Sequence, residues 1–362
     1  MKFTKLILVL ILATLIFGCE NDDPQTTTKN PEKTAVKPDN AKPLNPAVEK
    51  IIKENPEVIT DENGNRKYQL NLKMKLNETR KHEIFNVTRV AQIVGGVEKS
   101  NSYKDLINYT ETPIRRIDES VATEVKYLNI EKSFENEDGV TLLVDTSDIN
   151  KSKDKATTLI FQVITQIPLT LHINPLAQIE KVEGSDDIVN AAMSKIFGDK
   201  QDTHPDAKTW RDSLTKNFNE SELKETFHEG FFHLPEKPIA VNEVWEDEVV
   251  LTLRSVGQAA FKLNLTVTGV KKVKDELIAE MKISGKVDIE NENTKINNDL
   301  GITESSYEGY ITFNITTGSY GIFKRKAVVL ISAIDSNNKV TKTTMTLGKE
   351  EKVSVYDPMK DE

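Results

Sequence analysis

Residues 307–315 read Tyr-Glu-Gly-Tyr-Ile-Thr-Phe-Asn-Ile, and the odd-numbered positions, which include Tyr307, Ile311 and Phe313, are apolar or glycine. Alternation with a period of two places one set of side chains on a buried face of a β-strand and the other set in solvent. The same pattern recurs on either side of this segment. It predicts further strands over residues 245–253, 261–267, 277–283 and 327–333, with weaker ones over 340–347 and 353–356.

The first half of the chain shows the same period less regularly. Alternation starts at Tyr68 and continues to Leu76, and Pro168 suggests an edge strand or a bulge within one of the segments that follow. The further segments predicted as strands are residues 82–94, 117–132, 138–145, 156–173 and 177–183.

The spacing of apolar residues changes to a helical one in the middle of the chain. It predicts helices over residues 186–197, 205–218 and 219–227, and Asn219 with Glu222 forms a capping-box pattern at the start of the third. Together these elements predict a mainly β protein with a large antiparallel meander. Because flat sheets rarely exceed about 10 strands, we expect this meander to curl into a half-barrel or to split into two packed sheets. The short mid-chain helical segment would cover its apolar face.

The first 18 residues have the features of a secretory signal peptide. Lys2 and Lys5 precede an apolar run over residues 6–17, which is shorter than the roughly 20 residues needed to span a bilayer. The sequence Ile16-Phe17-Gly18-Cys19 resembles the lipobox of bacterial lipoproteins. The resemblance implies that Cys19 carries acyl chains such as palmitate, which anchor the protein in a membrane. It also implies an outer membrane lipoprotein, on the periplasmic side or at the cell surface.

The sequence divides the chain into six segments. A signal peptide (1–18) precedes the lipidated cysteine and a disordered tether (19–45), which is rich in polar residues and proline. An N-terminal helix and β half (46–184) follows, and its helix is predicted over residues 45–53. The helical cover (185–235), the C-terminal β half (236–356) and a tail (357–362) complete the chain.

The order of helix, strands, helical group and strands resembles the half-barrel of the periplasmic lipoprotein-carrier and receptor family, the LolA/LolB type. The resemblance covers roughly residues 46–356 at the level of element order. It implies a curved antiparallel sheet covered by helices, with acyl chains held between them. The residues that we expect to line such a space are aromatic and lie on the cover or on the dry faces of strands: Trp210, Phe218, Phe227, Phe231, Trp245, Phe261 and Phe313.

The composition argues against several functions. The net charge is −9. A protein that binds nucleic acid normally presents a basic surface to the phosphates, so this charge argues against nucleic-acid binding. With one cysteine and five histidines, zinc sites built on four cysteines, or on two cysteines and two histidines, are excluded. In His228-Glu229-Gly230-Phe231-Phe232-His233 the histidines are five positions apart, so they do not share one helix face as a zinc-protease pair does. We therefore expect no metal, no cofactor and no catalytic residue, and protein partners remain unknown from the sequence.

These observations favour a membrane-anchored, non-catalytic lipoprotein that binds an apolar or amphipathic ligand, such as a lipid, between sheet and helices. The alternative is a structural or interaction module at the cell surface that has a filled core and binds protein or glycan. The two hypotheses differ in whether the helices leave a space beneath them.

Overall fold

The structure, a computed structural model, describes residues 58–60, 66–94, 97–228, 231–254, 256–297, 300–334 and 340–356. Its main element is a single thirteen-stranded sheet with the strand order β10-β11-β12-β14-β15-β16-β3-β4-β5-β7-β8, to which β13 and β6 add as partners of β11 and β5. All described pairs are antiparallel. The mainly β class and the large antiparallel sheet are confirmed.

The strands differ widely in length, and the long ones lie in the centre of the sheet. Those of the first half are β3 (Arg80–Val94), β4 (Val97–Ile117), β5 (Ser120–Asn136), β6 (Gly139–Asp145), β7 (Leu169–Ile173) and β8 (Ile179–Glu183). Those of the second half are β10 (Val244–Leu253), β11 (Gly257–Val273), β12 (Glu276–Val287), β13 (Lys295–Ile296), β14 (Leu300–Asn314), β15 (Ser319–Ile334) and β16 (Val340–Val355).

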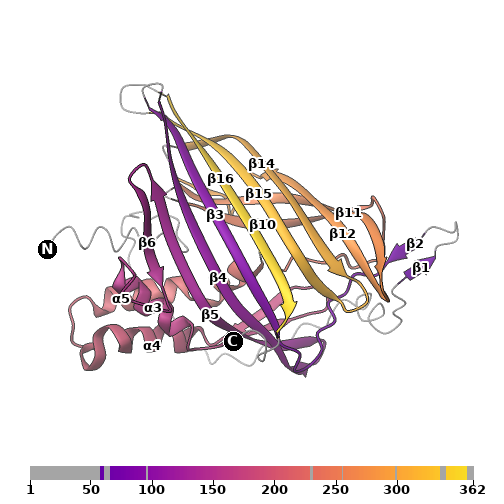
Figure 1. The fold of residues 1–362 in the computed structure, drawn as a ribbon, viewed down its shortest axis with the longest axis horizontal. Coiled ribbons are helices and arrows are strands. Elements are labelled where there is room, and N and C mark those ends of the chain that lie inside the picture. Colours follow the sequence, from indigo (N-terminus) through magenta and orange to yellow (C-terminus); the bar gives the residue numbers. More distant parts are fainter. Residues whose placement is uncertain are drawn as a thin grey trace, which may run out of the picture.

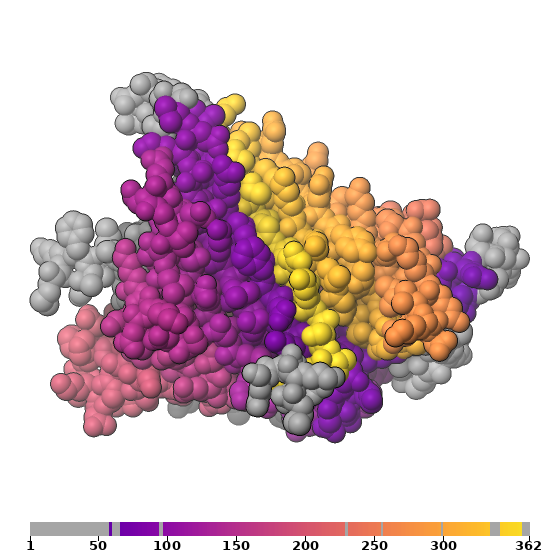
Figure 2. All heavy atoms as spheres, viewed as in Figure 1, coloured from indigo at the N-terminus to yellow at the C-terminus, as the bar shows by residue number. Residues whose placement is uncertain are grey.

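The two halves of the chain meet where the last strand pairs with the first long one. β16 runs antiparallel to β3 over thirteen residue pairs, from Thr343 opposite Gln92 to Val355 opposite Arg80. In Figure 1 the yellow β16 lies beside the indigo β3, and Figure 2 shows the two halves as one continuous outer surface. The sequence left open one sheet or two, and this pairing shows that both halves share one curled, open sheet.

The helices cover the inner face of this sheet. They are α3 (Lys155–Ile164), α4 (Ser185–Phe197), a 3-10 turn η1 (Gly198–Lys200), α5 (Ala207–Asn217) and α6 (Glu220–His228). Figure 1 shows α3, α4 and α5 gathered beneath β5 at one end of the sheet. The three predicted mid-chain helices correspond to α4, α5 and α6, and Asn219 Oδ1 accepts a hydrogen bond from the backbone N–H of Glu222 at 3.0 Å, as the capping pattern predicts.

Helix α6 spans the opening between the two edge strands, β8 and β10. At its start Glu220 Oε1 accepts a hydrogen bond from the N–H of Val182 in β8, at 3.3 Å. At its end His228 Nε2 lies 2.8 Å from the carbonyl oxygen of Glu248 in β10. The sheet does not close on itself, because α6 occupies the place where β8 and β10 would meet.

The prediction of a strand over residues 156–173 is wrong in its first part, which forms α3. Asp154 caps this helix, because its Oδ1 accepts a hydrogen bond from the N–H of Thr157 at 3.0 Å. The buried residues include Ile160, Phe161 and Ile164, which follow a helical spacing. The alternation at every second position left out Ile160 and Ile164, which pack on the same helix face.

The alternation also missed β4, the longest of the described strands. Its inward positions include Asp105 and Glu111 among the aromatic and aliphatic residues. These carboxylates interrupt the hydrophobic pattern that identifies a half-buried strand.

The predicted strand over residues 68–76 is wrong beyond Tyr68. Only Arg66–Tyr68 form a strand, β2, which pairs with β1 (Val58–Thr60) and β9 (Ile239–Ala240) in a separate three-stranded sheet. The chain then crosses one end of the main sheet as an irregular segment in which Leu70, Leu72 and Met74 are buried.

Backbone hydrogen bonds hold the irregular segment in place. The N–H of Leu72 donates to the carbonyl of Pro175, and the N–H of Lys73 donates to that of Gly318, both at 2.8 Å. Lys73 Nζ donates to the carbonyl oxygens of Ile315 and Thr316. The segment therefore closes this end of the core.

The predicted signal peptide, Cys19, the tether, the helix over residues 45–53 and the tail from residue 357 lie outside the described residues. Within the part of the chain that the structure describes, no helix has the length and hydrophobicity that crossing a membrane requires.

Gly318 tests the packing of the irregular segment. Its φ is +60°, and a Cβ at this position would lie 2.4 Å from the backbone nitrogen of Lys73. A left-handed backbone alone costs a residue other than glycine about 1–2 kcal/mol. We expect Gly318→Ala to lower the free energy of unfolding in urea by about 2 kcal/mol or more, because the clash adds to this strain.

Gly269→Ala is the matched control, because a Cβ on Gly269 meets no atom within 4 Å. Its effect should stay within about 0.5 kcal/mol. Equal stability of the two variants would contradict the contact between Gly318 and Lys73.

Candidate ligand-binding cavity

A cavity of about 290 Å³ lies between the inner face of the sheet and the helices. Its walls come from β3, β4, β5, β7, β10, β11, β15 and β16 on one side and from α3, α4 and α6 on the other. It is far larger than the roughly 10–15 Å³ that a single water needs. Aliphatic and aromatic side chains form most of the wall, among them Ile84, Ile107, Tyr109, Tyr127, Ile130, Phe161, Ile164, Ile188, Leu223, Leu251 and Leu347.

One row of polar residues crosses the sheet wall of the cavity. In the strand register Arg325 of β15 stands opposite Lys349 of β16, which stands opposite Asn86 of β3, then Asp105 of β4 and Lys132 of β5. All five line the cavity. We call this set the polar row. It contains three cations and one carboxylate, so the row carries a net positive charge.

Partners within the cavity hold the cations of this region in place. Lys132 Nζ lies 3.2 Å from Asp105 Oδ2, and burial lowers the pKa of Lys132 even though Asp105 acts in the opposite direction. The guanidinium of Arg254 lies 3.5 Å from the ring centroid of Tyr103, a cation–π contact. Arg254 therefore adds a fourth cation to the lining beside the polar row.

Helix α6 supplies the opposite wall and part of the opening. Leu223 and Phe227 are buried against the core, whereas Glu222 and Glu225 are half-buried and line the cavity. Burial raises the pKa of both carboxyl groups, and each also lies near another carboxylate. Thr226 lines the cavity and is exposed, so the cavity reaches solvent beside α6.

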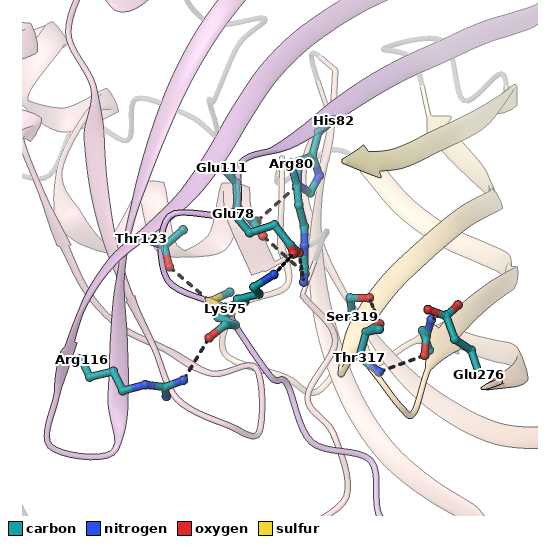
Figure 3. Close-up of polar contacts among 12 residues, drawn as sticks. Lys75, Glu78, Arg80, His82, Glu111, Arg116, Thr123, Glu276, Thr317 and Ser319 are labelled. Atoms are coloured by element: carbon teal, nitrogen blue, oxygen red, sulfur yellow. Dashed lines mark hydrogen bonds and ion pairs between the residues drawn. The ribbon is translucent and has the colours of Figure 1, made fainter. Parts of the chain in front are cut away.

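A buried ionic network lies directly next to the polar row. His82 Nδ1 is 2.8 Å from Glu351 Oε1, and His82 Nε2 is 3.3 Å from Glu111 Oε2. Lys349 Nζ lies 3.3 Å from Glu351 Oε2, and the ring of His82 stacks on Tyr109. Figure 3 shows how His82, Arg80 and Glu111 converge from neighbouring strands.

The network determines the charge on its members. Burial opposes a positive charge on His82, but Glu111 and Glu351 outweigh it and raise the pKa of His82 to about 9. Burial also opposes ionisation of Glu351, yet Lys349 and His82 lower its pKa to about 2. At neutral pH the interior therefore holds an imidazolium between two carboxylates.

The structure places the seven aromatic residues that the sequence suggested as cavity lining in different surroundings. Phe218 and Phe227 line the large cavity, and Phe231 lines a small pocket next to His82 and Tyr320. Phe261 and Phe313 are fully buried in the packed core, away from the cavity. Trp210 packs edge-on against Phe197, and the indole N–H of Trp245 donates to the carbonyl of His233.

Sequence reasoning missed the charged lining residues. The predicted strands at 340–347 and 353–356 leave out the positions of Lys349 and Glu351, which point inward on the continuous strand β16. The sequence did contain a signal for these residues. In the two predicted strands on either side of the gap most of the apolar residues occupy odd-numbered positions, so the two segments could have been joined into one strand. A polar gap between two such segments is the pattern that a long strand shows where it passes a polar interior site.

The described residues also contain one group of side chains suited to a metal ion, formed by His228, His233 and Asp247. The two histidines do not share one helix face, in agreement with their spacing, because α6 ends at His228. The ring centroids of His228 and His233 nevertheless lie 4.3 Å apart.

The His82 network predicts a specific pH dependence of stability. The pKa of His82 is about 9 in the folded protein, whereas that of an unperturbed histidine is 6.5. Because the folded-state pKa is the higher one, the contribution of His82 is complete below pH 6.5 and is lost as the pH rises through 9. We expect His82→Gln to abolish a fall in the free energy of unfolding of up to about 3 kcal/mol over this window.

Urea unfolding at several pH values measures this difference. His204→Gln is the matched control, because His204 lies in the exposed connection before α5. Parallel pH profiles for the wild type and His82→Gln would show that the imidazole is not held in its charged form.

Comparisons with known proteins give one family match and several low-scoring matches to solved structures. No curated protein matches the chain. Among solved structures, a lipovitellin structure titled for its lipid–protein interactions matches with a TM-score of 0.42 and 9% identity, covering 78% of this chain. The match covers 26% of the lipovitellin chain, so this protein spans about a quarter of that length.

Two further structures match with lower scores. DynF, from the dynemicin biosynthesis pathway of Micromonospora chersina, has a TM-score of 0.19 and 7% identity, with 85% of this chain and 89% of that chain covered. An outer membrane channel from Pseudomonas putida F1 has a TM-score of 0.16 and 6% identity, with 78% and 97% covered.

The sequence match to a family is more extensive. It covers residues 118–319, more than half of the chain, from the start of β5 to the start of β15. The matched region includes all four described helices and both edge strands, β8 and β10. The protein therefore belongs to DUF6263, a family of unknown function.

Proposed function

We propose that the protein binds an amphipathic ligand with an acidic head group in the cavity between sheet and helices, and that it does so without catalysis. The observation that carries the proposal is the polar row, which crosses the wall of an otherwise largely apolar cavity. An apolar ligand would make no polar contact with these charged groups. An acidic head group would use them as partners.

The arrangement suits the two ends of such a molecule. Aliphatic and aromatic side chains take up an apolar tail, at about 25 cal/mol per Å² of apolar surface removed from water. Lys132, Arg254 and Arg325 place cationic groups on the same wall. Hydrogen bonds to charged groups inside a protein are stronger than those between neutral groups, so a carboxylate or phosphate head would be bound and oriented there.

The charge distribution gives the ligand a direction. Four cations and two carboxylates, Asp105 and Glu351, lie on the sheet wall, whereas the charged residues of α6 that line the cavity, Glu222 and Glu225, are both acidic. An acidic head group is therefore attracted to the sheet wall and repelled from the helix. The tail would then contact the apolar residues of α3 and α6.

The alternative of an interaction module at the cell surface required a filled interior. A cavity of about 290 Å³ with charged lining favours the ligand-binding hypothesis instead. The curved sheet covered by helices also agrees with the architecture implied by the resemblance to lipoprotein carriers. We further propose that acyl chains on Cys19 anchor the protein in the outer membrane, on the periplasmic side or at the cell surface.

Organic extraction of the purified chain tests the proposal directly. Residues 20–362, which lack the proposed lipidation site, should release an acid-headed amphiphile in a one-to-one ratio, identified by mass spectrometry. Fatty acids and phospholipids share the acidic head chemistry, and their masses distinguish them. An extract without ligand, combined with no binding of either class in a fluorescence displacement assay, would contradict the proposal.

Lys132→Met tests the polar row. It should weaken binding of an acid-headed amphiphile about 10- to 100-fold, because a hydrogen bond to a charged group contributes about 1.5–3 kcal/mol. Binding of the corresponding alcohol-headed amphiphile should change much less. Lys262→Met is the control, since Lys262 is exposed on β11 and pairs with Glu246 outside the cavity. An equal loss for both head groups would indicate damage to the fold.

Cys19→Ala tests the proposed anchor. The substitution removes the only cysteine of the chain and with it the site for acyl chains. We expect the protein to move from the membrane fraction to the soluble fraction, as judged by immunoblotting. Persistence in the membrane fraction would show that another part of the protein holds it there.

A further inference from the structure

Two histidines and one buried aspartate meet at the edge of the sheet, outside the cavity lining. His228 is the last residue of α6, His233 lies in the segment that follows, and Asp247 points inward from β10. His233 Nδ1 lies 2.9 Å from Asp247 Oδ1, and His228 Nε2 lies 3.7 Å from the same oxygen. Three elements therefore contribute one donor atom each.

The surrounding hydrogen bonds hold these donors in place. Asp247 has a side-chain exposure of 3%, and its two oxygens accept from the backbone N–H groups of His233 and Glu248, both at 2.9 Å. The carbonyl of His233 accepts from the indole N–H of Trp245 at 2.9 Å. The carboxylate and the His233 backbone are thus fixed before any ion arrives, which reduces the cost of binding one.

We infer that His228, His233 and Asp247 bind a divalent transition-metal ion of the zinc class. Tetrahedral donors at bond lengths of about 2.0–2.1 Å lie about 3.3 Å apart. The two distances from histidine nitrogens to Asp247 Oδ1, 2.9 and 3.7 Å, lie on either side of this value, and all three donor atoms lie within 4.8 Å of one another. Imidazole donors favour zinc, copper, nickel or iron over magnesium or calcium, whose ligands are mainly oxygen atoms.

Metal binding exchanges existing contacts in a defined way. His228 Nε2 lies 2.8 Å from the carbonyl oxygen of Glu248. A metal–nitrogen bond replaces any proton on this nitrogen, and protons on ligand atoms are released to solvent. Because the His233 side chain is 40% exposed, solvent reaches this residue and can supply a water molecule as a further ligand.

The site would fasten the helical cover to the sheet. α6 spans the opening between β8 and β10, and it contacts β10 at its end through His228. A metal ion shared by His228, His233 and Asp247 would connect α6, the following segment and β10 at one point. The inference does not depend on the proposed ligand, because none of the three residues lines the cavity.

Calorimetric titration of Zn²⁺ into the purified, chelator-treated protein without a histidine tag tests this inference. We expect one ion per chain, and His233→Ala should weaken binding about 100-fold or more, since even indirect contacts to metal ligands contribute 10- to 100-fold. His204→Ala is the control, because His204 lies apart from the site, on the connection before α5. It should bind as tightly as the wild type.

Two further readouts guard against a folding defect. Co²⁺ should give the visible absorption of a protein-bound ion in the wild type and not in His233→Ala, while the far-ultraviolet circular dichroism of both stays the same. Zn²⁺ should raise the Tm of the wild type and leave that of Asp247→Asn unchanged. No binding by the wild type, or equal binding by His233→Ala, would show that the three residues form only an ion pair.

Discussion

The structure depends on the pairing of β16 with β3. These strands are far apart in the sequence, yet their thirteen residue pairs join two groups of strands into one sheet. Without this pairing each group would present a long strand edge with unpaired backbone N–H and C=O groups, which promotes aggregation. With it, the sheet is long enough to curl, and its two ends approach the same helix.

That curl places the helices and the cavity. Because β8 and β10 lie on either side of α6, the helix completes the enclosure that the sheet leaves open. The interior thus has a rigid wall of long strands and a second wall of short helices. Fewer hydrogen bonds connect α6 to its neighbours than connect two long strands. Movement of the helical wall therefore requires less free energy than movement of the sheet.

The charged interior is costly for stability, which is an argument for its function. Removing charged groups from water costs several kcal/mol per ion, and replacing a buried ion pair with apolar residues is often neutral or stabilising. The pairs formed by Lys132 with Asp105 and by Lys349 with Glu351 act against this cost through their mutual attraction. The stability of the fold alone therefore does not account for charges at these positions, which fits the proposed role in ligand binding.

The local sequence determined the class of the fold and most of its elements. Alternation with a period of two identified the strands of the C-terminal half, and helical spacing with the Asn219 cap identified the mid-chain helices, because these patterns depend on neighbours within one turn or one strand. The local pattern gave the wrong element at α3, where the apolar residues fit both a strand period of two and a helical period. It also missed β4 and part of β16, where inward-facing residues are charged. Only the tertiary structure decided that β16 pairs with β3, that the polar row is aligned across five strands, and that His228 and His233 meet Asp247. The register between distant strands and the path of a connecting segment depend on packing across the whole molecule. The local spacing of apolar residues contains no information about such packing.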